Sequence, residues 1–322
     1  MSHVVTPAPH VRDKETSGKI MREVLFALTP ACVMGIYFFG VRALIIILTS
    51  VAACVLFEAL YQKVTKQTLT VSDCSAALTG LLLAFNLPAS APFWMPVVGA
   101  FVAVIIAKQL FGGIGQNFVN PALSGRAFLM AAYTPQMASS FSEPLDGFKN
   151  FFTFDTVTSA TPLINMAEEG FAPARADYIN SLLGMTGGCI GEVCAAALIA
   201  GGVYLLVKKI ISWHIPVTFL GVSFLFILVF GNNPAYHMIN GGMILGAFFM
   251  ATDYATSPVT VKGRLIFGAG CGILVGVIRL YGGYPEGVCY AILLMNLAVP
   301  LIDRYTRPRV YGVTHHKKKS EV

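Results

Sequence analysis

Charged residues are scarce in this sequence. Only 12% of its 322 residues are charged, whereas 56% are hydrophobic, and soluble domains average about one quarter charged. There is too little polar surface to cover a soluble fold of this length, so a soluble enzyme or a nucleic-acid-binding protein is excluded. The composition predicts a multi-spanning membrane protein.

Motifs for several common cofactors are also missing. None of the seven cysteines forms a Cys-x-x-Cys pair, and most lie in apolar runs, where cysteine usually acts as a small buried hydrophobe. This argues against an iron–sulfur cluster held by this chain alone, and no metal site is predicted. No Gly-x-Gly-x-x-Gly fingerprint follows a predicted strand. The N-terminal residues lack the apolar core of a cleavable signal peptide, so none is expected.

Apolar runs of roughly the length a bilayer requires occur ten times. The predicted spans are 22–39, 43–62, 72–88, 93–111 and 117–134, followed by 186–207, 210–230, 237–252, 265–281 and 285–302. The fold class is therefore an all-α multi-spanning membrane protein with about ten transmembrane helices. Its predicted parts are an N-terminal segment (1–21), a first membrane half (22–134), a long loop (135–184), a second membrane half (185–302) and a basic tail (303–322).

Basic residues are distributed unevenly between the two sides that ten spans define. Seventeen of the 22 lysines and arginines fall on the side of the termini, and only Arg42, Lys149 and Arg175 fall on the other. The positive-inside rule therefore predicts that both termini are cytoplasmic. The loop 135–184 is then extracytoplasmic, and we expect Thr161 within it to be exposed.

Two pairs of segments indicate an internal repeat. Residues 78–85 resemble 241–248, and Lys108-Gln109-Leu110-Phe111-Gly112-Gly113 resembles Arg279-Leu280-Tyr281-Gly282-Gly283. The similar offsets relate the third to fifth spans to the eighth to tenth. Because five spans separate the copies, they cross the membrane in opposite directions, which is an inverted repeat of the kind found in transporters.

The polar loop contains the segment Asp155-Thr156-Val157-Thr158-Ser159-Ala160-Thr161-Pro162-Leu163. By local chemistry it is a capped turn, and Thr161 is an ordinary loop threonine. The segment also resembles the acceptor motif of bacterial flavin transferases, which join FMN to the last threonine through a phosphoester bond. Asp155, Thr158, Ala160 and Thr161 match that motif, whereas Ser159 stands where many such motifs have glycine.

Polar residues inside the spans or at their ends are further candidates for a site. Arg126 would be costly in lipid unless it meets an anion or lines a cavity. It follows a stretch that includes Asn120 and Gly125, and a flavin phosphate is a suitable anion for its guanidinium group. The alternatives are an internal salt bridge or snorkelling of the side chain to the outer surface. Asp253 either caps a helix end or lines a cavity for a cation or a flavin ring. Glu58 and Glu192 are buried carboxylates that could lie on an ion path.

Together these segments resemble one family. The chain resembles the D subunit of the Rnf complex, the ion-translocating ferredoxin–NAD oxidoreductase, and is more distantly similar to the B subunit of the sodium-translocating NADH–quinone reductase. The likeness extends over about residues 20–310. It rests on Gly-Gly-Ile-Gly-Gln-Asn-Phe-Val-Asn-Pro-Ala (112–122), Gly-Arg-Ala-Phe (125–128), the segment 155–163, Ala-Thr-Asp-Tyr-Ala-Thr-Ser-Pro (251–258) and Tyr-Pro-Glu-Gly (284–287).

The resemblance implies a membrane subunit in the bacterial cytoplasmic membrane that carries FMN on Thr161. It implies a non-covalent riboflavin within the helices and electron transfer between neighbouring subunits while Na⁺ or H⁺ is moved. Implied partners are a second flavoprotein subunit, iron–sulfur subunits and a flavin transferase. No catalytic residue is predicted in this chain, since flavin carries the redox chemistry. The alternatives are a self-sufficient transporter or channel and a purely structural anchor for other redox subunits.

Overall fold

The structure of the chain is a computed structural model that describes residues 16–138, 141–142, 144, 158–159, 161–169, 173–192, 194–282 and 287–307. The described residues are mostly helical, as the sequence predicts. By length and composition, three helices could cross a membrane, namely α1 (Ser17–Val64), α12 (Val261–Tyr281) and α13 (Val288–Thr306). Several shorter apolar helices accompany them. The number of spans and the inverted repeat therefore stay predictions.

The first half is built around α1. Two spans are predicted over this region, and α1 consists of two helical segments that meet at a break at Gly40, whose φ of 64° only glycine adopts readily. Ser50 of α1 donates a hydrogen bond to the carbonyl of Gly80 at 2.7 Å, which fixes the next helix against it. The elements that follow α1 are η1 (Val71–Asp73), α2 (Ser75–Phe85), α3 (Met95–Ala100), η2 (Phe101–Ile106), η3 (Gln109–Phe111), α4 (Pro121–Ala132) and α5 (Thr134–Ala138).

The predicted long loop contains its own secondary structure. A two-residue strand β1 (Phe141–Ser142) pairs antiparallel with β2 (Thr158–Ser159). Two short helices follow, α6 (Pro162–Glu169) and α7 (Arg175–Leu183). β2 ends two residues before Thr161, and α6 begins directly after it, so the predicted acceptor residue lies at the junction of a strand and a helix.

The second half contains α8 (Ala195–Val207), α9 (His214–Phe230), α10 (Pro234–Ile239), α11 (Met243–Leu245), η5 (Gly246–Met250), α12 and α13. Helix α12 packs closely against both α9 and α13. The segment before α8 joins the halves, because Gly191 donates its backbone N–H to the carbonyl of Phe85 at 3.0 Å. A Cβ at Gly191 would lie 2.2 Å from the Phe85 side chain, so this crossing requires glycine.

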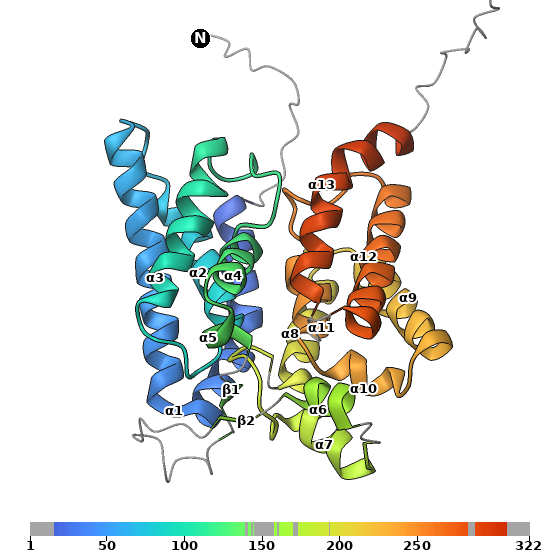
Figure 1. Cartoon of the computed structure of the whole chain (residues 1–322). Coiled ribbons are helices and arrows are strands. Elements are labelled where there is room, and N and C mark those ends of the chain that lie inside the picture. Colours follow the sequence, from blue (N-terminus) through green and yellow to red (C-terminus); the bar gives the residue numbers. More distant parts are fainter. Residues whose placement is uncertain are drawn as a thin grey trace, which may run out of the picture.

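Figure 1 shows how the two ends of the molecule differ. The start of α1 and the end of α13 lie at the same end of the molecule, which we call the termini end. Helices α6 and α7 and the β1–β2 pair lie at the opposite end, which we call the loop end (Figure 1). Large apolar side chains are exposed between them, such as Leu56 at 67% and Val229 at 70%. Such a surface fits contact with lipid, and the chain is a membrane protein.

Candidate functional site

Thr161 is buried, with only 5% of its surface exposed. The expectation of an exposed loop threonine is therefore wrong for this conformation. The residue precedes α6, where Pro162 occupies the first helical position, and its hydroxyl and carbonyl oxygens accept the N–H of Ile164 at 3.4 and 3.0 Å. Threonine before a helix that starts with proline is a favoured N-terminal arrangement. The local turn was predicted correctly, but its packing against the rest of the protein was not.

The buried threonine lines a pocket of about 20 Å³, which we call the loop-end pocket. Its other walls come from three segments of the chain, comprising Pro162, Leu163, Thr186, Gly187, Gly188, Glu192, Asn240 and Gly241. A Cβ added to Gly188 would meet no atom within 4 Å, so the pocket has open space on that side. Its free volume is enough for about one water molecule, so the pocket is a narrow polar space directly beside the Thr161 side chain.

Arg126 of α4 does not line this pocket itself but is paired with Glu192, a carboxylate that does. Its guanidinium group donates to Glu192 at 3.2 Å, and both side chains are about 95% buried. It also donates to the amide oxygen of Asn86. The internal salt bridge, which was the alternative interpretation of this arginine, is thus present, and Arg126 stands behind Glu192 rather than in the pocket wall.

Arg279 of α12 is a second buried arginine near the pocket, with 7% of its surface exposed. It donates to the carbonyl oxygens of Asn240 at 3.0 Å and Gly241 at 2.9 Å, and also to that of His237. Gly241 has a φ of 67°, and a Cβ there would lie 2.7 Å from Arg279 and 2.5 Å from Leu163. The arginine therefore fixes the glycine turn that forms one wall of the pocket.

The remaining predicted site residues are not gathered around Thr161 in the described structure. Asp155 and Ala160 lie outside the described residues, and Thr158 and Ser159 are placed only as backbone of β2. Asn120 caps α4 by accepting the N–H groups of Ala122 and Leu123 at 3.1 and 3.3 Å. Gly125 is a packing residue, because a Cβ there would lie 2.7 Å from the carbonyl oxygen of Gly99.

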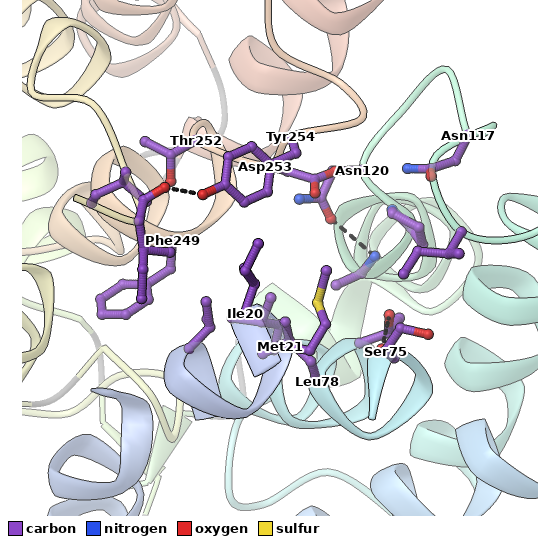
Figure 2. A pocket seen from close by; sticks show the side chains of 18 of the residues that line it. Ile20, Met21, Ser75, Leu78, Asn117, Asn120, Phe249, Thr252, Asp253 and Tyr254 are labelled. Carbon is purple, nitrogen blue, oxygen red and sulfur yellow. Dashed lines mark hydrogen bonds between the residues drawn. The ribbon is translucent and has the colours of Figure 1, made fainter. Parts of the chain in front are cut away.

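Asn120 instead lines a larger cavity of about 90 Å³ between the two halves, which we call the inter-half cavity. Figure 2 shows Asn117, Asn120, Thr252 and Asp253 on one side of this cavity and apolar side chains from α1 and α2 on the other. Asn120 also donates to the carbonyl oxygen of Met250 at 3.2 Å, which ties α4 to the second half. The start of α1 contributes to the lining, so this cavity faces the termini end.

Asp253 is the acidic residue of the inter-half cavity. Burial raises the pKa of its carboxyl group, while Thr256, the backbone of Ala255, Asn117 and Lys108 oppose that shift. Its side chain accepts a hydrogen bond from Thr256 at 3.1 Å. Asp253 therefore belongs to a cavity wall, which was one of the two interpretations of this residue.

A second buried ion pair lies beside the same cavity. The ammonium group of Lys108 contacts both carboxylate oxygens of Glu58 at 3.0 and 3.2 Å, and the two side chains are 3% and 1% exposed. Ser75 accepts from Lys108 at 2.7 Å, and Gln109 donates to Glu58 at 2.7 Å. Glu58 was predicted as a buried carboxylate, but its partner was not predicted.

Four residues around the acceptor were not predicted as part of its site, namely Glu192, Asn240, Gly241 and Arg279. Glu192 was marked only as an intramembrane carboxylate, and Arg279 only as part of a repeat. Arg279 could have been found from the sequence as an arginine inside a predicted span, because burying an arginine in a membrane without partners is costly. Thr161 is far from Asn240 and Arg279 in the chain, so their proximity follows from the tertiary structure alone.

These features define a class of protein, namely a polytopic helical membrane protein with buried ion pairs and two separate polar cavities. The chain belongs to the NQR2, RnfD, RnfE family, whose model matches residues 4–312. The resemblance predicted from the sequence motifs is thereby confirmed.

Three relatives illustrate the similarity. The chain is 50% identical over 319 residues to the D subunit of the Na⁺-translocating ferredoxin:NAD⁺ oxidoreductase complex of Acetobacterium woodii, covering 98% of each chain. It is 44% identical over 322 residues to the D subunit of the proton-translocating ferredoxin:NAD⁺ oxidoreductase complex of Clostridium ljungdahlii, covering 96% of each. It is 39% identical over 350 residues to the D subunit of the ion-translocating oxidoreductase complex of Escherichia coli, covering 98% of this chain and 99% of the relative.

Proposed function

We propose that this chain is the D subunit of an Rnf-type complex in the bacterial cytoplasmic membrane, that it carries FMN on Thr161, and that the complex couples electron transfer between ferredoxin and NAD to movement of Na⁺ or H⁺. Family membership with relatives of that name over nearly the whole chain supports the complex. The Ala160-Thr161 pair within the acceptor segment supports the flavin.

The loop-end pocket borders the side-chain oxygen of Thr161 to which FMN would be attached. A new bond would join this oxygen to the phosphorus of FMN while the hydroxyl proton is lost. A flavin transferase would take the FMN group from a flavin dinucleotide, whose pyrophosphate bond breaks and whose nucleoside monophosphate leaves. Glycine residues line the space beside Thr161, so backbone N–H groups could approach phosphate oxygens closely. Bound FMN would supply the redox chemistry. Arg279 would provide buried positive charge near the ester, and the charge of Glu192 in the pocket wall would be balanced by Arg126.

The inter-half cavity is our candidate for the non-covalent riboflavin. It lies between the two halves of the protein and contains about 90 Å³ of free space. Apolar walls with a few amide, hydroxyl and carboxyl groups suit a flat ring with polar edges. Asn117, Asn120 and Asp253 would hold those edges.

The finer architecture is part of the proposal. The described helices overlap all ten predicted spans, and Lys108 and Arg279, which are equivalent in the predicted inverted repeat, are both buried. The start of α1 and the end of α13 lie at one end of the molecule, and α6, which Thr161 directly precedes, lies at the other (Figure 1). With the basic side in the cytoplasm, FMN would be held near the outer face, and electrons from a cytoplasmic donor would cross the bilayer.

The test is ferredoxin-dependent NAD reduction by the assembled complex. We expect Thr161→Ala to lower the rate to that of a complex lacking this subunit. Thr156→Ala changes a threonine of the same segment at a position where the acceptor motif specifies no residue, and it is expected to leave the rate intact. Full activity of the Thr161→Ala complex would contradict the redox role and favour a structural anchor.

A self-sufficient transporter or channel is the second candidate, supported by the buried carboxylates and the predicted inverted repeat. It predicts ion flux through vesicles containing this chain alone, without any electron donor. The redox proposal predicts flux only in the assembled complex, and only with an electron donor and acceptor present.

A further inference from the structure

A cleft at the termini end adjoins the inter-half cavity, with which it shares Ile210, Ile211, Thr252 and Tyr254, but its charged residues are different. Its volume is about 620 Å³. We call it the basic cleft, and it is lined by Leu206, Lys209, Ile210, Ile211, Ser212, Trp213, Ile215, Thr252, Tyr254, Ser257 and Arg264. Two cations and no carboxylate occur among these lining residues, so the cleft favours an anion.

We propose that the basic cleft binds the headgroup of an anionic phospholipid, with the acyl chains lying along the adjoining faces of α8, α9 and α12. Lys209 would contact the phosphate from the turn between α8 and α9. Arg264, on the first turn of α12, donates through Nε to the carbonyl oxygen of Pro258 at 3.1 Å. That bond orients the side chain and leaves the terminal guanidinium nitrogens for a phosphate.

The walls favour an amphiphile over a free anion. Besides its cations, the cleft is lined by the aliphatic side chains of Leu206, Ile210, Ile211 and Ile215. Free inorganic phosphate would gain nothing from such a wall. An ordered headgroup with its glycerol and first methylene groups would contact both the polar and the apolar residues.

Aromatic residues place the cleft at the level of a membrane interface. Trp213 is 56% exposed and Tyr254 is 54% exposed, and the Tyr254 hydroxyl donates to the carbonyl oxygen of Ile210. Tryptophan and tyrosine collect at that level because they have an apolar body and a polar tip. Beside the cleft, Val207, Val217 and Val261 are 75%, 55% and 52% exposed, which provides an apolar track for acyl chains.

The nearby carboxylates of the described structure have hydrogen-bond donors of their own. Asp253 accepts from Thr256 at 3.1 Å, and Asp303 accepts the N–H of Val259 at 3.2 Å. Glu23 accepts from Tyr204 at 2.5 Å in a neighbouring pocket that Lys208 and Lys209 also line. Basic pockets between helices on the cytoplasmic side are a recognised form of anionic-lipid site.

The chain has two tryptophans, which gives a direct assay. In a Trp94→Phe background, Trp213 is the sole tryptophan of the full-length chain in phosphatidylcholine nanodiscs. We expect brominated phosphatidylglycerol to quench its fluorescence at a much lower mole fraction than brominated phosphatidylcholine. The reciprocal Trp213→Phe protein reports on Trp94 and is expected to show no such preference.

Removing the two cations tests the assignment. We expect Lys209→Gln with Arg264→Gln to lower the preference for phosphatidylglycerol about 20-fold, from the loss of two charge contacts. Lys66→Gln is the matched control, because Lys66 and Lys209 each lie just after the end of a helix and have positive φ values of 57° and 58°. The Lys66→Gln protein should keep the preference for phosphatidylglycerol. Arg264→Lys keeps the charge and should retain most of the preference, which separates loss of charge from misfolding.

Several outcomes would overturn the proposal. Equal quenching by the two lipids in the Trp94→Phe protein would exclude a headgroup site. Reversal of quenching by excess inorganic phosphate would assign the cleft to a free anion. Unchanged quenching in the double variant, together with loss of assembly with other subunits, would assign it to an acidic protein partner.

Discussion

The two buried ion pairs found among the described residues differ in what surrounds them. Glu58 and Lys108 form a closed network, in which Ser75 and Gln109 supply further hydrogen bonds. Glu192, by contrast, is paired with Arg126 on one side and lines the loop-end pocket with Thr161 on the other. A carboxylate saturated by its neighbours serves structure, whereas one that also borders open space is available to a ligand. We therefore expect the first pair to serve stability and, under the proposed function, the second pair to serve flavin attachment.

The largest expected effect is on stability, at the first pair. Glu58→Gln leaves the ammonium group of Lys108 buried without its counter-charge, and we expect it to lower the free energy of unfolding by about 3–5 kcal/mol. Replacing both residues by methionine should restore most of the loss, since no charge is then buried. Thermal unfolding of the single and double variants in detergent measures this, and additive losses would show that the pair does not act as a unit.

The second pair is expected to affect flavin attachment more than folding. Arg126→Met removes the partner that orients Glu192 beside Thr161, so we expect covalent FMN on Thr161 to fall about tenfold or more, as for the loss of a positioning contact. Lys108→Met with Glu58→Met should leave FMN attachment intact. In-gel flavin fluorescence per mole of protein compares them. Equal flavin loss in both would remove the distinction between the two pairs.

A substitution at Gly241, in the turn that forms one wall of the loop-end pocket, is expected to have an intermediate effect on stability. Gly241→Ala forces alanine into a positive φ and a Cβ against Arg279, and we expect a loss of about 1–3 kcal/mol in stability with reduced FMN attachment. Gly221→Ala is the control, because a Cβ there meets no atom within 4 Å. In the middle of α9 it should stabilise by roughly 0.5–1 kcal/mol. Unfolding temperature and flavin content would both report the difference.

The smallest effect is expected at Asp253 and depends on pH. Burial raises the pKa of this carboxyl group in the folded protein, so the folded state holds the proton more tightly than the unfolded state. The wild-type protein therefore loses stability as the pH rises from the unfolded pKa through the folded pKa. The Asp253→Asn protein has no carboxyl group to ionise there and does not lose this stability. Its unfolding temperature should therefore exceed that of the wild type only at pH values above the folded pKa of Asp253. If the variant were more stable than the wild type at low pH and lost that difference as the pH rises, the raised pKa of Asp253 would be contradicted.

Helix positions were largely predictable from the sequence, because apolar runs of about 20 residues carry a strong signal. The runs 22–39 and 43–62 correspond to α1, and the break at Gly40 falls between them. The run 237–252 was predicted as one span and is instead α10, α11 and η5, separated by the turn at Gly241 and Gly242. Composition does not reveal that turn, since it depends on contacts with Arg279 and Glu192.

The candidate site was predictable only where it is local. The acceptor segment could be identified from consecutive residues, and so could the turn before Pro162. The burial of Thr161 and its proximity to Glu192 and Gly241 depend on how three distant segments pack. Arg126 illustrates the limit: its charge signalled a buried partner, but the sequence did not decide between a phosphate and a carboxylate.

The most direct measurement is the mass of the peptide containing Asp155–Leu163, from protein made together with its flavin transferase. We expect an addition equal to FMN minus water on Thr161, present in the Thr156→Ala protein and absent from the Thr161→Ala protein. An unmodified wild-type peptide under those conditions would contradict the covalent flavin and leave transport without redox chemistry as the better explanation of this fold.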